Sequence, residues 1–105
     1  MAVYTVGAGG TFATVAAAMA SLSPAVAPGD TLQFVSGYTG EIAAVTINNL
    51  IFIGDATNTG ITLNLAPGIT TATLQGTAPI NVSDGLNTVI NGNDGDNVVT
   101  LTGGG

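Results

Sequence analysis

Short runs rich in Val, Ile, Leu and Thr return regularly through the chain after Gly29, separated by Gly, Asn, Asp and Pro residues. Runs of this composition, bounded by turn residues, predict β-strands. The strands form two interleaved series, and within each series the members lie roughly 16–22 residues apart. The first series comprises Thr31–Val35, Leu50–Ile53, Thr71–Leu74 and Thr88–Ile90, and the second comprises Val45–Ile47, Ile61–Leu65, Ile80–Val82 and Val98–Leu101.

This period is the sequence signature of a β-solenoid, in which each coil stacks on the previous one around a continuous apolar core. We therefore predict an all-β fold, a right-handed parallel β-helix of about four coils in which parallel strands dominate. Residues 1–105 would form a single domain, with the coils over residues 30–102. The strand alternation predicts that one set of side chains points inward: Leu32, Phe34, Ile47, Ile51, Ile53, Leu63, Leu74, Val82, Ile90 and Val99.

One segment before these strands has the periodicity of an amphipathic helix. Thr11 can cap its start, and Pro24 with the Pro28-Gly29 pair follows its end. We expect a helix over residues 11–22 that packs against the core. Its apolar residues share one face: Phe12, Val15, Met19 and Leu22.

The chain contains no Lys, Arg, His or Cys, although it carries six carboxylates. General bases near neutral pH, thiolate and amine nucleophiles, guanidinium groups and imidazole metal ligands are therefore missing. We predict that the protein is not an enzyme. The six carboxylates are Asp30, Glu41, Asp55, Asp84, Asp94 and Asp96.

The composition also limits the partners. With 46% hydrophobic residues and a mean hydropathy of +0.56, the chain should fold despite its net charge of −6. Without a cation it cannot neutralise phosphates, so nucleic acid and anionic membrane surfaces are poor partners. No stretch approaches the roughly 18 apolar residues that span a bilayer, so we expect no membrane insertion. The N-terminus lacks the features of a signal peptide, so the chain is intracellular, or its signal lies elsewhere or has been removed.

Three consecutive segments carry a resemblance to a known fold family: YTVGAGGTFATV over residues 4–15, PGDTLQFVSGYTGE over 28–41 and VTINNLIFIG over 45–54. Together they resemble the N-terminal cap and first coils of right-handed parallel β-helix proteins of the pectate-lyase and pectin-methylesterase type. The resemblance covers about the first half of the chain and implies that helix 11–22 covers the open end of the solenoid. These enzymes rely on basic residues, which this chain lacks, so the resemblance does not imply their activity.

A weaker resemblance lies in GNDGDNVV over residues 92–99, which is similar to the calcium-binding nonapeptides of RTX proteins. Oxygen-rich turns suit calcium, so the resemblance implies a calcium site formed by Asn93, Asp94, Asp96 and Asn97. The motif occurs once, and Asn97 stands where the repeat normally has aspartate. A plain Asn/Asp/Gly-rich turn between two strands is the alternative interpretation.

Two classes of function compete. The first is a non-catalytic structural subunit that self-assembles into a homo-oligomer or filament, in an extracellular fibre or surface layer. We expect the last strand to be an uncapped edge that pairs with another chain through Val98, Val99 and Leu101. The predicted helical cap is an objection to head-to-tail stacking. The second is a carbohydrate-binding or adhesive module, stabilised by calcium if the site at 93–97 exists, with Tyr38 as the exposed aromatic contact for a glycan.

Overall fold

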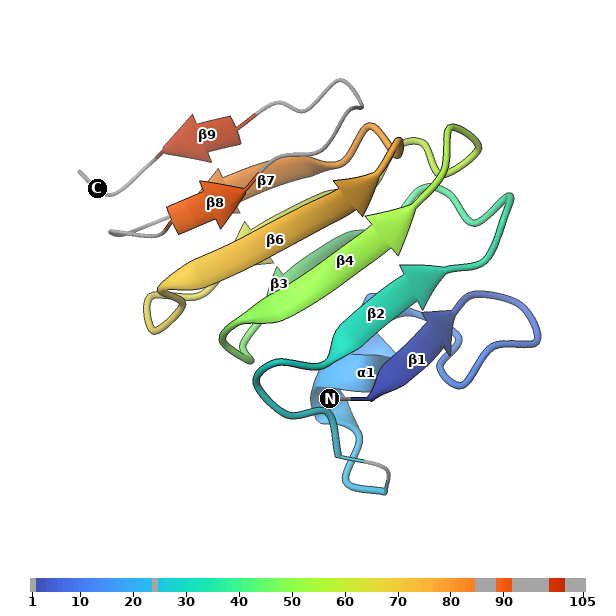
Figure 1. Ribbon diagram of the computed structural model, residues 1–105, viewed down its shortest axis with the longest axis horizontal. Helices are drawn as coiled ribbons and strands as arrows, with labels where there is room; N and C mark the ends of the chain where they lie inside the picture. Colours follow the sequence, from blue (N-terminus) through green and yellow to red (C-terminus); the bar gives the residue numbers. More distant parts are fainter. Residues whose placement is uncertain (1, 24, 85–88, 92–98, 102–105) are drawn as a thin grey trace.

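Two parallel β-sheets and one short helix make up the fold in the computed structural model, which describes residues 2–23, 25–84, 89–91 and 99–101 (Figure 1). A radius of gyration of 12.4 Å is that of a compact domain, which for a chain of this length has a radius of about 13 Å. The elements in order are β1 (Val3–Val6), α1 (Val15–Ala20), β2 (Thr31–Phe34), β3 (Ile42–Val45), β4 (Leu50–Gly54), β5 (Thr62–Leu65), β6 (Thr71–Gly76), β7 (Asn81–Asp84), β8 (Val89–Asn91) and β9 (Val99–Leu101).

From β2 onward the chain alternates between the two sheets. The larger sheet has the strand order β1-β2-β4-β6-β8 and the smaller has the order β3-β5-β7-β9, and every pairing between neighbours is parallel. The predicted dominance of parallel strands is therefore confirmed, and so is the division of the strands into two interleaved series. The largest error in a strand position is at β3, which covers Ile42–Val45 instead of the predicted residues 45–47.

The predicted fold class is wrong. Instead of an all-β solenoid of about four coils over residues 30–102, the chain forms two small parallel sheets with a helix in a compact, α/β-like arrangement. Strand β1 was not predicted from the sequence, and it pairs in parallel with β2. Because α1 lies between these two strands in the chain, the first connection is β-α-β, and the helix packs against β3 at the end of the smaller sheet.

The helix is also shorter than predicted, with six residues instead of the span 11–22. Thr14, not Thr11, is its N-cap, and the Thr14 hydroxyl accepts a hydrogen bond from Ala17 N at 3.0 Å. Phe12 precedes the helix and forms an isolated parallel bridge with Val6. Leu22 lies beyond the C-cap and is 90% exposed, so it does not continue the apolar face.

The apolar core lies between the sheets and includes the buried face of α1, where Val15 and Ala18 are fully buried. Five of the predicted core residues are buried, namely Leu32, Phe34, Leu63, Leu74 and Val82. Ile47 is only partly buried, and the side chains of Ile90 and Val99 lie outside the described residues.

The predicted inward placement of Ile51 and Ile53 is wrong. The inward positions of β4 are Leu50, Phe52 and Gly54, while the two isoleucines are half-buried on the outer face of the larger sheet. The strand is apolar at nearly every position, so alternation between apolar and polar residues could not identify its buried face.

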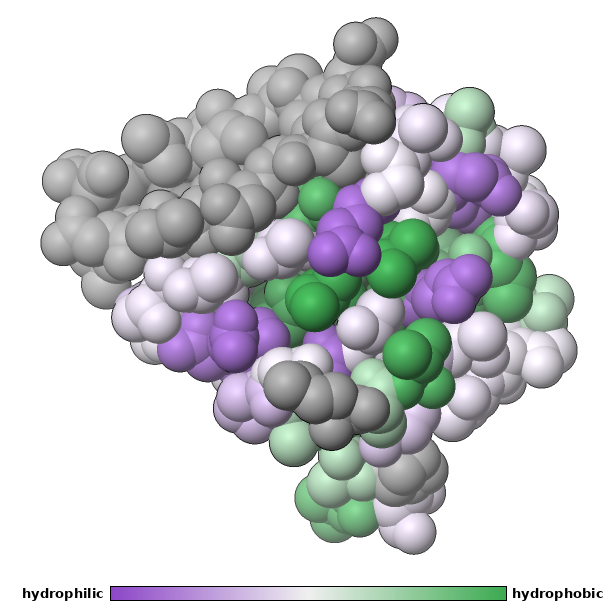
Figure 2. Space-filling model, in the orientation of Figure 1, coloured by the Kyte–Doolittle hydropathy of each residue, from purple (hydrophilic) through white to green (hydrophobic). Residues whose placement is uncertain are grey.

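This outer face mixes apolar and hydrophilic residues (Figure 2). Across three neighbouring strands, Gln33 of β2 lies in register with Ile53 of β4, and Ile53 lies in register with Gln75 of β6. Both glutamines are exposed. The face is therefore an uncharged, partly apolar surface, and its polar positions are amides and hydroxyls.

Candidate functional site

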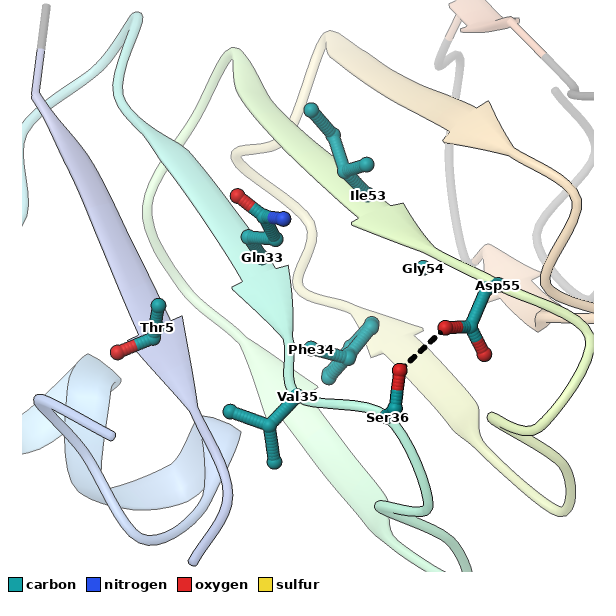
Figure 3. Close-up of a pocket in the computed structure, with 8 residues that line it drawn as sticks. All are labelled: Thr5, Gln33, Phe34, Val35, Ser36, Ile53, Gly54 and Asp55. Carbon is teal, nitrogen blue, oxygen red and sulfur yellow. Dashed lines mark hydrogen bonds between the residues drawn. The ribbon is translucent and has the colours of Figure 1, made fainter. Parts of the chain in front are cut away.

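A shallow hollow of about 360 Å³ opens where β1, β2 and β4 end (Figure 3). Its charged group is the carboxylate of Asp55, which begins the turn after β4, and its apolar lining includes Val35 and Ile53. The complete lining is Thr5, Gln33, Phe34, Val35, Ser36, Ile53, Gly54 and Asp55.

Hydrogen bonds hold the Asp55 carboxylate in place. Ser36 Oγ donates to Asp55 Oδ2 at 2.6 Å, and Thr57 N donates to Oδ1 at 2.8 Å, with a further short bond from the Thr57 hydroxyl. These bonds, that from Ser36 first, hold the pKa of the Asp55 carboxyl below its ordinary value. A lower pKa makes this carboxylate a weaker base, so the Ser36–Asp55 pair is poorly suited to activating the serine as a nucleophile.

Asn58 lies behind this turn with its side chain fully buried. Its Nδ2 donates to the carbonyl oxygens of Val35 at 2.8 Å and Tyr38 at 3.0 Å, while its Oδ1 accepts from Asp55 N at 2.8 Å. One side chain therefore satisfies three backbone groups in the turns that follow β2 and β4. Asn58 is a structural link between successive turns, and its polar atoms do not face the hollow as free ligands.

Gly54 provides the space for this amide. A Cβ at residue 54 would lie 2.7 Å from Asn58 Oδ1 and 2.8 Å from the Cβ of Ala78, closer than side chains tolerate. Gly76 is in register with Gly54 in the next strand and has φ +79°. The two glycines let neighbouring strands end where the chain turns tightly around Asn58.

Tyr38, the predicted glycan contact, is partly buried and bonded within the fold. Its ring stacks on Phe34 with the centroids 5.6 Å apart and an interplanar angle of 4°. Its hydroxyl donates a short hydrogen bond to Glu41 Oε1. Burial, followed by the hydrogen bond and negative charge of Glu41, raises the pKa of the Tyr38 hydroxyl. One ring face and the hydroxyl are thus already engaged, so the geometry does not present Tyr38 as an open sugar platform.

Glu41 joins this tyrosine to the helix. Its Oε1 accepts a hydrogen bond from Val15 N at 2.7 Å, and its Oε2 accepts one from Ala16 N at 3.0 Å. A carboxylate that lies 25 residues away in sequence therefore binds the unpaired N–H groups of the first turn of α1. This contact anchors the helix to the start of β3.

Asp30 is another carboxylate bonded within the fold and is 5% exposed. Its Oδ1 accepts from Ala2 N at 2.8 Å, and its Oδ2 accepts from Ala27 N at 2.9 Å. These two backbone hydrogen bonds, that from Ala2 first, lower the pKa of the Asp30 carboxyl. The carboxylate ties the approach to β1 to the loop that precedes β2.

The predicted calcium ligands Asn93, Asp94, Asp96 and Asn97 lie outside the described residues. Within the described ranges, no group of three or more Asp or Glu residues is placed to hold a metal ion. Of the predicted assembly residues, Val99 and Leu101 belong to β9, which pairs with β7, while Val98 is not described.

The two ends of the sheets differ in how their edge strands are covered. At the N-terminal end, Phe12 N donates to Thr5 O at 3.0 Å and Gly7 N donates to Phe12 O at 2.9 Å, so the segment before α1 pairs with the edge of β1. Helix α1 packs against β3, the corresponding edge of the smaller sheet. At the other end, no described residue pairs with the outer edges of β8 and β9 (Figure 1).

The structural roles of Asn58, Glu41 and Asp30 were not predicted from the sequence. Asn58 lies in the turn after β4, and Asp30 directly precedes β2; at such positions Asn and Asp side chains commonly form hydrogen bonds to the backbone. That signal could have marked both as turn residues, but the distant partners of Asn58 depend on which turns stack together. No local signal connects Glu41 to a helix that begins 26 residues earlier.

Comparison of the chain with protein-family models, curated proteins and solved structures finds no match. Within the described residues, no helix has both the length and the apolar character needed to cross a membrane. The geometry is therefore the basis for a functional proposal.

Proposed function

We propose that the chain is a non-catalytic structural subunit that associates with other copies of itself through the edge formed by β8 and β9, in an extracellular or cell-surface assembly. The observation that carries the proposal is the contrast between the two ends of the sheets. Backbone pairing and a helix cover the edges of β1 and β3, whereas no described residue pairs with the outer edges of β8 and β9. Unpaired strand edges are templates for pairing with another chain.

The composition of these two strands supports the proposal. Natural edge strands are commonly protected by Lys, other charges, Pro or bulges. The sequences of β8, VIN, and β9, VTL, contain no charge, proline or glycine. Four of the six residues are Val, Ile or Thr, which favour β-structure. The strands therefore carry no charge or proline that would oppose edge pairing, although each is only three residues long and shortness itself protects an edge.

The state of three carboxylates supports a non-catalytic role. Asp30, Glu41 and Asp55 each accept two or more hydrogen bonds from groups within the fold. The chain has no cation that could stabilise developing negative charge in a reaction. These carboxylates contribute to the architecture of turns and of the helix terminus.

A carbohydrate-binding module is the second candidate. The hollow beside Gln33 and Asp55 supplies polar groups, because the Gln33 side chain is exposed and makes no hydrogen bond to a described residue. However, the Phe34 ring at the hollow is buried and Tyr38 is stacked upon it, so an open aromatic platform is missing from the described residues. We therefore favour the structural role.

The experiment compares wild-type protein with two single proline variants, Val99→Pro and Thr100→Pro, by multi-angle light scattering. Successive N–H groups of a strand point to opposite edges, so one variant loses a bond to β7 and the other loses an outward donor. We expect the wild type to associate, and more strongly with salt, because its net charge of −6 is repulsive and salt screens charges beyond about 8–10 Å. The variant that lost the outward donor should stay folded by circular dichroism and remain monomeric. A wild type that is monomeric throughout, or two folded variants that associate as strongly as the wild type, would refute the proposal.

A further inference from the structure

We infer that association through the β8–β9 edge closes at a two-fold symmetric dimer and does not continue head to tail. The inference rests on the proposed function, since it names the geometry and the partner of the same edge. It follows from a comparison of the strand edges at the two ends of the sheets.

At the N-terminal end of the larger sheet, the outer edge of β1 is already occupied at Thr5 and Gly7. Phe12 donates its N–H to Thr5 O and accepts from Gly7 N, and the N–H of Thr11 donates to Thr5 Oγ1 at 3.0 Å. A copy arriving at this edge would have to break these bonds and displace Phe12, which is 7% exposed and packs edge-on against Tyr4.

The N-terminal end of the smaller sheet is closed by the helix. Glu41 binds the N–H groups of Val15 and Ala16, and Thr46 N donates to Met19 Sδ at 3.5 Å. Lifting α1 away would also expose Val15 and Ala18, both of which are fully buried. Head-to-tail growth needs this end free in every copy, so these contacts oppose it.

The opposite end presents two strand edges at once. β8 and β9 are the last of the described strands in their sheets and run in opposite directions (Figure 1). A partner that satisfies both edges must offer two strand edges with the same separation and opposite directions. A second copy related by a two-fold axis offers this pair, and its strands then meet β8 and β9 antiparallel. Because such an interface uses the same surface on both partners, it is complete at two chains.

The first test is the mass of the wild-type protein in light scattering as its concentration rises at moderate salt. The expected result is a rise from the 10.2 kDa monomer to a plateau at twice this mass. Growth beyond the dimer without a plateau would overturn the inference and leave the proposed function intact. A monomer at every concentration would refute the proposed function and the inference with it.

The second test exploits the absence of cysteine from the chain. Single variants Asn91→Cys in β8 and Val3→Cys in β1, where Val3 is 61% exposed, are treated with a bifunctional maleimide no longer than the roughly 10 Å between packed sheets. The two-fold dimer predicts that Asn91→Cys alone gives a covalent dimer, and that Val3→Cys alone does not. If neither variant cross-links alone but an equimolar mixture does, the contact is head to tail and the inference is wrong.

Discussion

Replacing Asn58 with alanine should be among the most damaging polar substitutions in the described part of the chain. Its fully buried amide satisfies the carbonyl groups of Val35 and Tyr38 and the N–H of Asp55. Each lost hydrogen bond is worth about 1 kcal/mol, and a buried group left without a partner costs about 1–3 kcal/mol. Because the smaller side chain lets water reach some of these groups, we expect a total loss of about 3 kcal/mol, a large part of the roughly 5–15 kcal/mol that stabilises a domain.

The assay is urea unfolding followed by circular dichroism, with Asn64→Ala as the matched control. Asn64 is exposed on β5, so its replacement should change the free energy of unfolding by no more than about 0.5 kcal/mol. Asn58→Asp provides a second comparison, because aspartate has nearly the same size as asparagine but its carboxylate cannot donate hydrogen bonds to the two carbonyl groups. If Asn58→Ala costs less than about 1 kcal/mol, the three hydrogen bonds do not have the energetic role assigned to them here.

Three further predictions concern acid stability, the core and the tight turn after β6. Folding lowers the pKa of Asp30, so the stabilisation that its carboxylate provides is present above the ordinary value of 3.8 and is lost as the pH falls through the lower folded pKa. Asp30→Asn should therefore flatten the acid dependence of the free energy of unfolding and lower stability at neutral pH by about 1–3 kcal/mol, as measured in unfolding titrations. Phe52→Ala should lower the free energy of unfolding by about 3–5 kcal/mol, whereas Ile51→Ala on the half-buried outer face should lower it by about 1 kcal/mol. Equal losses in urea unfolding would contradict the assignment of Phe52 to the buried face of β4 and Ile51 to the outer face. Gly76→Ala should lower the thermal midpoint sharply, because the new Cβ would lie 2.1 Å from Gly54 O at a φ of +79°; an unchanged midpoint would show that the turn relaxes freely.

The sequence predicted the strands well because each is a short β-branched or aliphatic run bounded by Gly, Asn or Pro. It did not predict the fold class, because β1 was missed and the helix was therefore placed outside the first pair of strands. The four-residue run Val3–Val6 is short, and its pairing with β2 across α1 is a long-range contact that composition does not reveal.

The candidate sites were harder to predict than the strands. Tyr38 was predicted to be an exposed aromatic contact, yet its ring stacks on Phe34 and its hydroxyl donates a hydrogen bond to Glu41. Glu41 caps a helix far from it in sequence, and Asn58 reaches carbonyl groups 20 and 23 residues away. Such contacts are set by which turns stack on each other, so they follow from the tertiary structure and not from local residue preferences.

The most direct test of the account measures amide hydrogen exchange by mass spectrometry at low and high protein concentration. If copies associate through the β8–β9 edge, peptides that cover residues 89–91 and 99–101 should exchange more slowly as concentration rises, because outward N–H groups gain partners. Peptides that cover β1 and residues 10–12 should exchange at the same rate at both concentrations, because their hydrogen bonds lie within one chain. Protection that does not change with concentration at β8 and β9, or that increases at β1, would contradict the account.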